Sequence, residues 1–261
     1  MRALLLAAGL GTRLKPLTDT LPKCLMPIHG RPLLEFWLES MASAGIAPSL
    51  VNLHAHADMV REYLDHCGYE NIHSVYEEEL LGTGGTLLKN KKFFEGDSIL
   101  LVHADNLSYF NAEAFVQAHA SRPPECEITM MLFRTPEPEK CSIVELDERG
   151  VVQKFHEKVE RPPGDLANGA VYIIEASLFP YLESLGREFI DFSVDVIPEY
   201  LGKIYTFFNE DFHRDIGNPN ALRSALADYN FPVPEGRADA EWNRSFAEKR
   251  DAIEKILNES E

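Results

Sequence analysis

Short apolar runs alternate with longer amphipathic stretches through the first half of the chain. The apolar runs predict four buried strands, at residues 2–7, 49–53, 72–75 and 98–102. The amphipathic stretches predict three helices, at residues 32–43, at residues 57–66 and from Thr86 onward. Because strands and helices alternate, we expect an α/β fold with a mainly parallel sheet and helices on both of its faces.

The middle of the chain has a different pattern, in which one β-rich run follows another. These runs predict four further strands, at residues 127–133, 142–146, 151–155 and 170–174. The turn sequence Asp147-Glu148-Arg149-Gly150 separates two of them. It predicts a β-hairpin, and the expected sheet is therefore mixed rather than purely parallel.

The last part of the chain predicts a helix at residues 218–228, a proline-rich linker and a final helix over residues 240–257. We therefore expect one folded domain over residues 1–231, followed by a linker and C-terminal helix over residues 232–261. Four apolar residues recur on the final helix at helical spacing: Trp242, Phe246, Ile253 and Leu257. We expect this stripe to pack on its own domain, with a subunit interface as the alternative.

Composition and charge exclude several classes of protein. The 261 residues include 25 basic and 42 acidic side chains, a formal net charge of −17, which would repel a nucleic-acid backbone. The apolar runs are too short to span a bilayer, and residues 2–7 resemble a buried strand more than a signal peptide. The four cysteines lack metal-ligand spacing, which favours free thiols in a reducing cytoplasm.

Positive charge is concentrated near the N-terminus. Residues 1–31 contain five basic residues and one acidic residue, and so carry +4 in an acidic chain. Such a segment predicts a site for a small, multiply charged anion. Within it, Gly9-Leu10-Gly11-Thr12-Arg13-Leu14 directly follows the first predicted strand. Glycines there let backbone N–H groups approach phosphate oxygens, and an arginine can bind those oxygens bidentately.

Three other structures compete with a phosphate loop as the interpretation of this glycine-containing segment. A surface turn with incidental charges would have the same local pattern. A dinucleotide-binding loop would need a third glycine where the chain has Leu14. A Walker A loop would need a Gly-Lys-Ser or Gly-Lys-Thr sequence, which the segment does not contain.

A longer set of motifs resembles a known family. Residues 9–18, with Pro22-Lys23, Pro27 and Pro32-Leu33, resemble the opening of the sugar-1-phosphate nucleotidylyltransferases, which make NDP-sugars from an NTP and a sugar 1-phosphate. The resemblance continues to about Tyr229. It rests on five further segments: Leu81-Gly82-Thr83-Gly84-Gly85-Thr86, Asp105-Asn106, Phe155-His156-Glu157-Lys158, Asn168-Gly169-Ala170-Val171-Tyr172 and His213-Arg214-Asp215-Ile216-Gly217-Asn218-Pro219. It implies a Rossmann-like nucleotide-diphospho-sugar transferase fold, with the catalytic domain in residues 1–231.

The resemblance also implies a role for individual residues. It implies catalytic roles for Arg13, Lys23 and Asp105, and a Mg²⁺ site held by Asp105 and Asp215. The implied nucleotide-binding residues are Ala7, Ala8, Gly9, Gly11, Thr12, Arg13, Lys23, Gly82, Thr83, Gly84 and Gly85. The implied sugar-phosphate-binding residues are Asn106, Ser142, Glu157, Lys158 and Asn168. Since Ser142 stands where many relatives have glycine, we expect it to influence which sugar binds.

The reaction implied is attack by a sugar-phosphate oxygen on the α-phosphorus of an NTP, with release of pyrophosphate. Charge neutralisation and positioning supply most of the catalysis in such a reaction. We favour guanylyl transfer to mannose 1-phosphate or manno-heptose 1-phosphate, in cytoplasmic nucleotide-sugar synthesis for cell-surface polysaccharide. Two alternatives remain: uridylyl or thymidylyl transfer to a glucose-, GlcNAc- or MurNAc-type 1-phosphate, and a catalytically silent subunit that binds a sugar nucleotide. We expect no membrane partner, and the sequence leaves the oligomeric state open, with a homodimer as one possibility.

Overall fold

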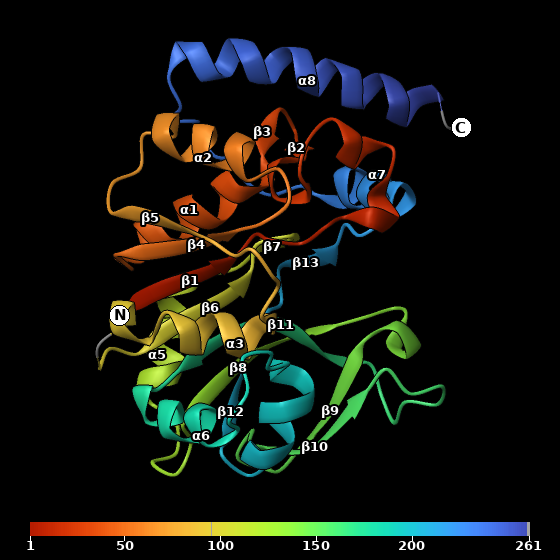
Figure 1. Ribbon diagram of the computed structural model, residues 1–261. Helices are drawn as coiled ribbons and strands as arrows, with labels where there is room; N and C mark the ends of the chain where they lie inside the picture. The colour runs from red at the N-terminus through yellow and green to blue at the C-terminus, as the bar shows by residue number, and fades with distance from the viewer. Residues whose placement is uncertain (95, 260–261) are drawn as a thin grey trace. The chain divides into compact units, whose positions relative to one another are not determined.

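The computed structural model describes residues 1–94 and 96–259 and divides into two compact units (Figure 1). The first unit consists of three segments: Met1–Leu4, Glu79–Val102 and Phe110–Asp211. The second unit consists of three others: Leu5–Glu78, His103–Tyr109 and Phe212–Glu261. Each unit contains both helices and strands, which confirms the α/β class. In residues 1–94 and 96–259, no helix combines the length and the apolar character that crossing a membrane requires.

The first unit is organised around strand β11 (Leu166–Ile174). This strand pairs antiparallel with three others: β6 (Ile99–His103), β8 (Ile128–Arg134) and β9 (Ser142–Leu146). A turn at the predicted hairpin sequence leads from β9 into the antiparallel β10 (Val152–Glu157), and β12 (Ile204–Phe208) pairs parallel with β8. The helices of this unit are α3 (Gly82–Lys89), α4 (Lys91–Phe94), α5 (Ala112–Ala120) and α6 (Phe179–Ser184). The unit therefore contains the predicted hairpin within a mixed sheet.

In the second unit, helix α2 (Ala57–His66) connects the parallel strands β4 (Ser49–Leu53) and β5 (Ile72–Tyr76). All five residues of β4 are buried, as expected of a strand that is covered on both faces. Two short antiparallel pairs accompany them: β2 (Pro27–Ile28) with β3 (Arg31–Pro32), and β7 (Asn106–Tyr109) with β13 (Phe212–Asp215). The other helices are α1 (Leu33–Ser43), α7 (Pro219–Asp228) and α8 (Ala240–Glu259). Strand β1 (Arg2–Leu6) divides between the two units.

The predicted elements are present, and the structure moves the start of two of them by four residues. Strand β11 begins at Leu166 rather than at the predicted residue 170. Helix α3 begins at Gly82 rather than at the predicted Thr86, because its glycines pack against a neighbouring segment of backbone. Among the described residues, five strands (β2, β3, β7, β12 and β13) and two helices (α5 and α6) lie outside the sequence prediction. The strands β7 and β13 have four residues each and exist through pairing with one another, which local pattern does not reveal.

Helix α8 packs on helix α2 of its own chain (Figure 1). All four residues of its predicted apolar stripe are buried, which confirms the prediction that the stripe packs within the chain. The Trp242 ring lies 5.1 Å from the ring of Tyr63 on α2. At the start of the helix, Asp239 accepts a hydrogen bond from the Trp242 amide at 3.0 Å, and its other oxygen lies 2.7 Å from His66 Nδ1. This cap and contact hold the first turn of α8 against α2.

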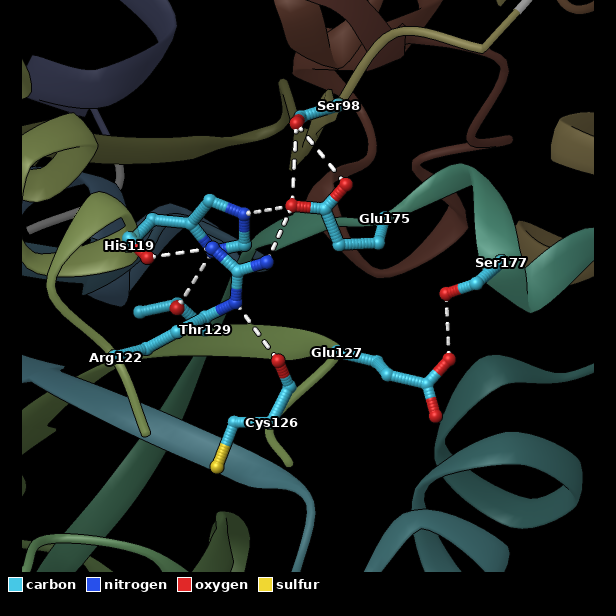
Figure 2. A network of polar contacts seen from close by, with 8 residues as sticks. All are labelled: Ser98, His119, Arg122, Cys126, Glu127, Thr129, Glu175 and Ser177. Carbon is cyan, nitrogen blue, oxygen red and sulfur yellow. Dashed lines mark hydrogen bonds and ion pairs between the residues drawn. The ribbon is translucent and has the colours of Figure 1, made fainter. Parts of the chain in front are cut away.

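A partly buried polar network joins four elements of the first unit (Figure 2). Glu175, which follows β11, accepts hydrogen bonds from Ser98 before β6 and from Arg122 after α5. The His119 ring lies between Glu175 and Thr129, with ring nitrogens 3.0 Å from Glu175 Oε1 and 2.7 Å from Thr129 Oγ1. Burial and the nearby Arg122 charge lower the pKa of His119, against the opposing effect of Glu175. The network therefore contains a neutral imidazole at neutral pH and ties the ends of β6, β8 and β11 together.

Candidate active site

The glycine-containing loop after β1 has a conformation that requires glycine at position 11. Gly11 has φ +60°, and a Cβ there would lie 2.7 Å from Thr18 Cγ2. The Gly11 carbonyl accepts hydrogen bonds from Thr18 Oγ1 at 3.0 Å and from the Leu14 amide at 2.9 Å. The turn is thus closed from within, and it projects the exposed side chain of Arg13 from a rigid base.

Sequence reasoning missed the residue that holds the beginning of this loop. The Ala7 amide donates a hydrogen bond to Asn52 Oδ1 at 2.8 Å, and Asn52 is only 3% exposed. The protein itself therefore engages the Ala7 amide, one of the expected nucleotide-binding groups. The signal for Asn52 was present in the sequence, because an asparagine inside the apolar run of β4 needs a hydrogen-bonding partner.

Two carboxylates and one lysine form the centre of the candidate site in the second unit. Asp105 follows β6, and Asp215 ends β13. Because β13 pairs with β7 so that Asp215 lies opposite Asn106, the two aspartates are brought together. Lys23 Nζ lies between them, 2.9 Å from Asp105 Oδ2 and 2.8 Å from Asp215 Oδ1. Its side chain is 8% exposed, so this is a largely buried charge with two counter-charges.

Lys23 and the two aspartates lie close enough to shift each other's pKa values. Burial alone would lower the pKa of Lys23, but the charges of Asp105 and Asp215 outweigh burial and raise it. Burial alone would raise the pKa of Asp105, but Lys23 and His103 together lower it. At neutral pH the cluster therefore combines a protonated lysine with an ionised Asp105.

Of the two glycines that lie near the carboxylates, only Gly217 leaves space that a side chain would fill. A Cβ at Gly9 would lie 3.9 Å from Asp105 Oδ2, and a Cβ at Gly217 would lie 2.7 Å from Asp215 Oδ2. Arg13 Nη2 approaches Asp215 Oδ2 at 3.9 Å and is otherwise exposed. The second unit thus brings Arg13, Lys23, Asp105 and Asp215 into one cluster, whose partly exposed carboxylates are accessible to a hard cation.

The predicted sugar-phosphate residues lie in the first unit, apart from Asn106, which begins β7 in the second. The β9–β10 hairpin places Glu157 opposite Ser142, and Ser142 Oγ donates a hydrogen bond to Glu157 Oε2. Lys158 Nζ lies 3.4 Å from the other carboxylate oxygen of Glu157. Asn168 lies on β11, one residue from the register contact between β11 and β9. The hairpin and β11 therefore collect four of the five predicted residues.

The glycines among residues 82–85, which also lie in the first unit, pack closely against another segment of the backbone. The amides of Gly84 and Gly85 donate to the Ile190 carbonyl at 2.9 and 3.3 Å. A Cβ at Gly85 would lie 2.2 Å from the Glu188 carbonyl oxygen, and one at Gly82 would lie 2.6 Å from the Ile190 carbonyl oxygen. The close approach that these glycines permit is therefore an approach of the protein's own backbone. Ile190 went unnoticed in the sequence, which carries no local signal for this contact.

The family model described as nucleotidyl transferase matches residues 2–230 of the chain. The chain belongs to the nucleotidyl transferase family. A mannose-1-phosphate guanylyltransferase of Mycobacterium tuberculosis is 31% identical over 232 residues, which cover 87% of this chain and 64% of that relative. A D-glycero-alpha-D-manno-heptose 1-phosphate guanylyltransferase of Campylobacter jejuni is 30% identical over 69% of this chain and 78% of its own length. The chain thus spans less than two thirds of the mycobacterial relative.

A solved structure has the same fold as this nucleotidyl transferase. It is the crystal structure of a candidate glucose-1-phosphate thymidylyltransferase from Bacillus anthracis, with a TM-score of 0.78 and 20% sequence identity. The match covers 89% of this chain and 98% of that one. The predicted fold is therefore confirmed. All of the predicted site residues lie within the region that the nucleotidyl transferase family model matches.

Proposed function

We propose that the protein is a Mg²⁺-dependent guanylyltransferase that converts GTP and mannose 1-phosphate or manno-heptose 1-phosphate into a GDP-sugar and pyrophosphate. The observation that carries this proposal is the Lys23 ammonium bound between Asp105 and Asp215. A lysine beside two carboxylates suits a reaction between two phosphate groups, in which charge must be neutralised and oxygens positioned. The names of the mycobacterial and Campylobacter relatives support the choice of guanosine and of a manno-configured sugar.

Lys23 and Arg13 supply the positive charge in this proposal. Because its two partners raise the pKa of Lys23, the ammonium stays protonated and lies as a fixed charge beside the reacting phosphates. Arg13 is 77% exposed on a rigid turn, so its guanidinium can bind the outer phosphates and the departing pyrophosphate. A phosphate monoester is already ionised at neutral pH, and the attacking oxygen therefore needs no general base.

Asp105 and Asp215 would hold the Mg²⁺ ion. Their side chains are 31% and 55% exposed, so carboxylate oxygens remain accessible beside the lysine contacts. Mg²⁺ usually takes one or two protein carboxylates and completes its octahedron with phosphates and water. Among the described residues, no group of three or more His, Cys, Asp or Glu side chains is arranged to hold a metal ion. When bound, the ion would neutralise phosphate charge.

Ser142, Glu157 and Lys158 would bind the sugar phosphate. Glu157 is held by Ser142 on one oxygen and approached by Lys158 on the other, so its carboxylate has one orientation in which to accept sugar hydroxyls. Lys158 is 64% exposed, and its backbone φ of +47° is uncommon for a lysine. Strained residues of this kind are concentrated at binding sites, and we assign the Lys158 ammonium to the sugar phosphate.

We also propose that the protein acts in the cytoplasm. Four free cysteines lie among the described residues, which agrees with a reducing cytoplasm. The GDP-sugar would serve as an activated donor for cell-surface polysaccharide. A homodimer is part of the same proposal, and light scattering of the purified chain tests it.

The direct test is pyrophosphate release with MgCl₂ across a grid of NTPs and sugar 1-phosphates. The NTPs are GTP, UTP, dTTP, CTP and ATP, and the sugars are glucose, mannose, N-acetylglucosamine, N-acetylmuramic acid and manno-heptose. We expect one strong signal, with GTP and a manno-configured sugar, that EDTA abolishes. A signal with UTP or dTTP would replace the guanylyl assignment and leave the reaction class intact. No turnover combined with calorimetric binding of an NTP would identify a silent subunit and refute the enzymatic proposal.

A further inference from the structure

Strand β11 contains an irregular segment within the predicted sugar-phosphate site. In its pairing with β8, Asn168 lies opposite Leu132 and Tyr172 lies opposite Met130. Four steps along β11 therefore match two steps along β8, and β11 carries two extra residues at this point. Extra residues of this kind bend a strand and turn its backbone groups out of the ladder.

On the edge of β11 that does not pair with β8, the neighbouring strand changes at this same segment. Ala167 is in register with β9, and from Val171 onward the strand is in register with β6. Gly169 and Ala170 fall between these registers, and in the described chain they belong to none of the three ladders that flank β11. Ala170 has φ +53°, a left-handed backbone conformation that an alanine adopts only when its surroundings require it.

A side-chain clasp closes this segment. Asn168 Nδ2 donates to Tyr172 Oη at 2.6 Å, and Asn168 Oδ1 accepts from the Ala170 amide at 3.0 Å. In a regular strand, the Cα atoms of two residues four positions apart are separated by about 13 Å, which is too far for this side-chain contact. The clasp and the irregular backbone therefore depend on each other.

The tyrosine itself is inaccessible to a substrate. Tyr172 is 1% exposed, and its ring lies 5.0 Å from the Phe192 ring. Burial raises the pKa of Tyr172, against hydrogen bonds from Asn168 and Ser193 that lower it, so the phenol is neutral. Asn168 and Ala170, by contrast, are only partly buried. The clasp thus connects a buried anchor to a surface that a ligand can reach.

From this geometry we propose that Tyr172 is a positioning residue for the sugar phosphate. Its hydroxyl orients the Asn168 amide and fixes the irregular segment of β11, so that Asn168 and the backbone of Ala170, both partly exposed, meet the sugar hydroxyls. Tyr172 touches no substrate and acts through Asn168. This inference rests on the proposed function, because it assigns a purpose to part of the proposed sugar-phosphate site.

The test replaces Tyr172 with phenylalanine, which keeps the buried ring and removes only the hydroxyl. With GTP, mannose 1-phosphate and MgCl₂, we expect the KM for mannose 1-phosphate to rise about tenfold, the effect of one lost hydrogen bond. The KM for GTP and kcat should stay within about twofold. Tyr229→Phe is the matched control, since Tyr229 is also buried and its hydroxyl donates to the Pro232 carbonyl at 2.9 Å. The control should leave both KM values unchanged.

Amide hydrogen exchange followed by NMR gives a second readout that needs no turnover. Tyr172→Phe should speed exchange of the Ala170 amide at least tenfold while the amides of β8 keep their protection. If Tyr172→Phe unfolds the protein, Asn168→Ala removes both hydrogen bonds of the clasp from its partly exposed side and should have the same effect on exchange. Unchanged exchange at Ala170, or a rise in both KM values together, would overturn the positioning role. If the wild type turns over no substrate pair, the proposed function fails, and the exchange result still decides whether Tyr172 holds the segment.

Discussion

Replacing Lys23 with methionine should lower the melting temperature by about 5 °C at pH 7 in metal-free buffer. Lys23 Nζ lies 2.9 Å from Asp105 Oδ2 and 2.8 Å from Asp215 Oδ1. The two carboxylate oxygens are therefore less than about 6 Å apart, and two unit charges at that distance repel by roughly 3 kcal/mol at an effective dielectric constant of about 20. Without the ammonium, only the exposed Arg13 guanidinium, 3.9 Å from Asp215 Oδ2, and the nearby His103 remain to offset part of that repulsion.

Two features of the site reduce the loss. The Asp215 side chain is 55% exposed, so water screens part of its charge. Methionine also retains most of the apolar stem of Lys23, and burying it avoids the desolvation of an ammonium. We therefore expect a net loss of about 2 kcal/mol in the free energy of unfolding, which for a chain of this size corresponds to about 5 °C.

Thermal unfolding followed by circular dichroism, with EDTA and then with MgCl₂, measures both parts of this argument. Lys203→Met is the matched control, because Lys203 Nζ lies 3.4 Å from one carboxylate oxygen of Glu127 and is 53% exposed. Its melting temperature should fall by less than about 1 °C. Mg²⁺ should raise the melting temperature of Lys23→Met more than that of the wild type, because two carboxylates have lost their counter-charge. Equal melting temperatures for the two lysine variants, or no response to Mg²⁺, would refute the reasoning.

Three other perturbations test separate parts of the structure. Asp105→Asn should lower kcat for pyrophosphate release at least about 100-fold, because it weakens a proposed metal ligand, and wild-type turnover would reject that assignment. The hydrogen bond to Asp239 raises the pKa of His66 from 6.5, so this contact stabilises the fold below pH 6.5 and is lost as the pH rises through the raised value. The melting-temperature difference between the wild type and His66→Gln should therefore shrink between about pH 6 and about pH 9, and a constant difference would contradict the linkage. Gly85→Ala, whose Cβ would lie 2.2 Å from a backbone oxygen, should lose about 2 kcal/mol of stability, whereas Gly164→Ala meets nothing within 4 Å. Equal melting temperatures for these two variants would show that the close packing at Gly85 carries no energy.

Local pattern predicted much of the fold correctly. The bounds of β4 (Ser49–Leu53) and α2 (Ala57–His66) agree with the sequence prediction residue for residue. The hairpin between β9 and β10 and the apolar stripe of α8 are also as expected. These features depend on the periodicity of apolar residues and on turn chemistry, which act over a few neighbouring residues. The strands β7 and β13 escaped prediction because four residues have no periodicity to detect.

In the candidate site, too, local motifs predicted the residues, whereas their contacts depend on residues far apart in the chain. Motif resemblance identified Lys23, Asp105 and Asp215 as important, but it did not indicate that the lysine would bridge the two aspartates. These contacts join residues 82 and 192 positions apart in the chain. Neither the Asn52 contact to the loop after β1 nor the Ile190 contact to the glycines of α3 belongs to any of the recognised motifs.

The sequence by itself therefore determined many of the helices and strands of this protein, its family and the chemical types of its site residues. Only the tertiary structure decided which of those residues touch. The clasp between Asn168 and Tyr172 shows why, because a regular strand would keep the two side chains apart and the irregularity that joins them arises where β11 exchanges β9 for β6. Strand pairing is a long-range choice among partners of similar local pattern, and its outcome depends on the packing of the whole unit.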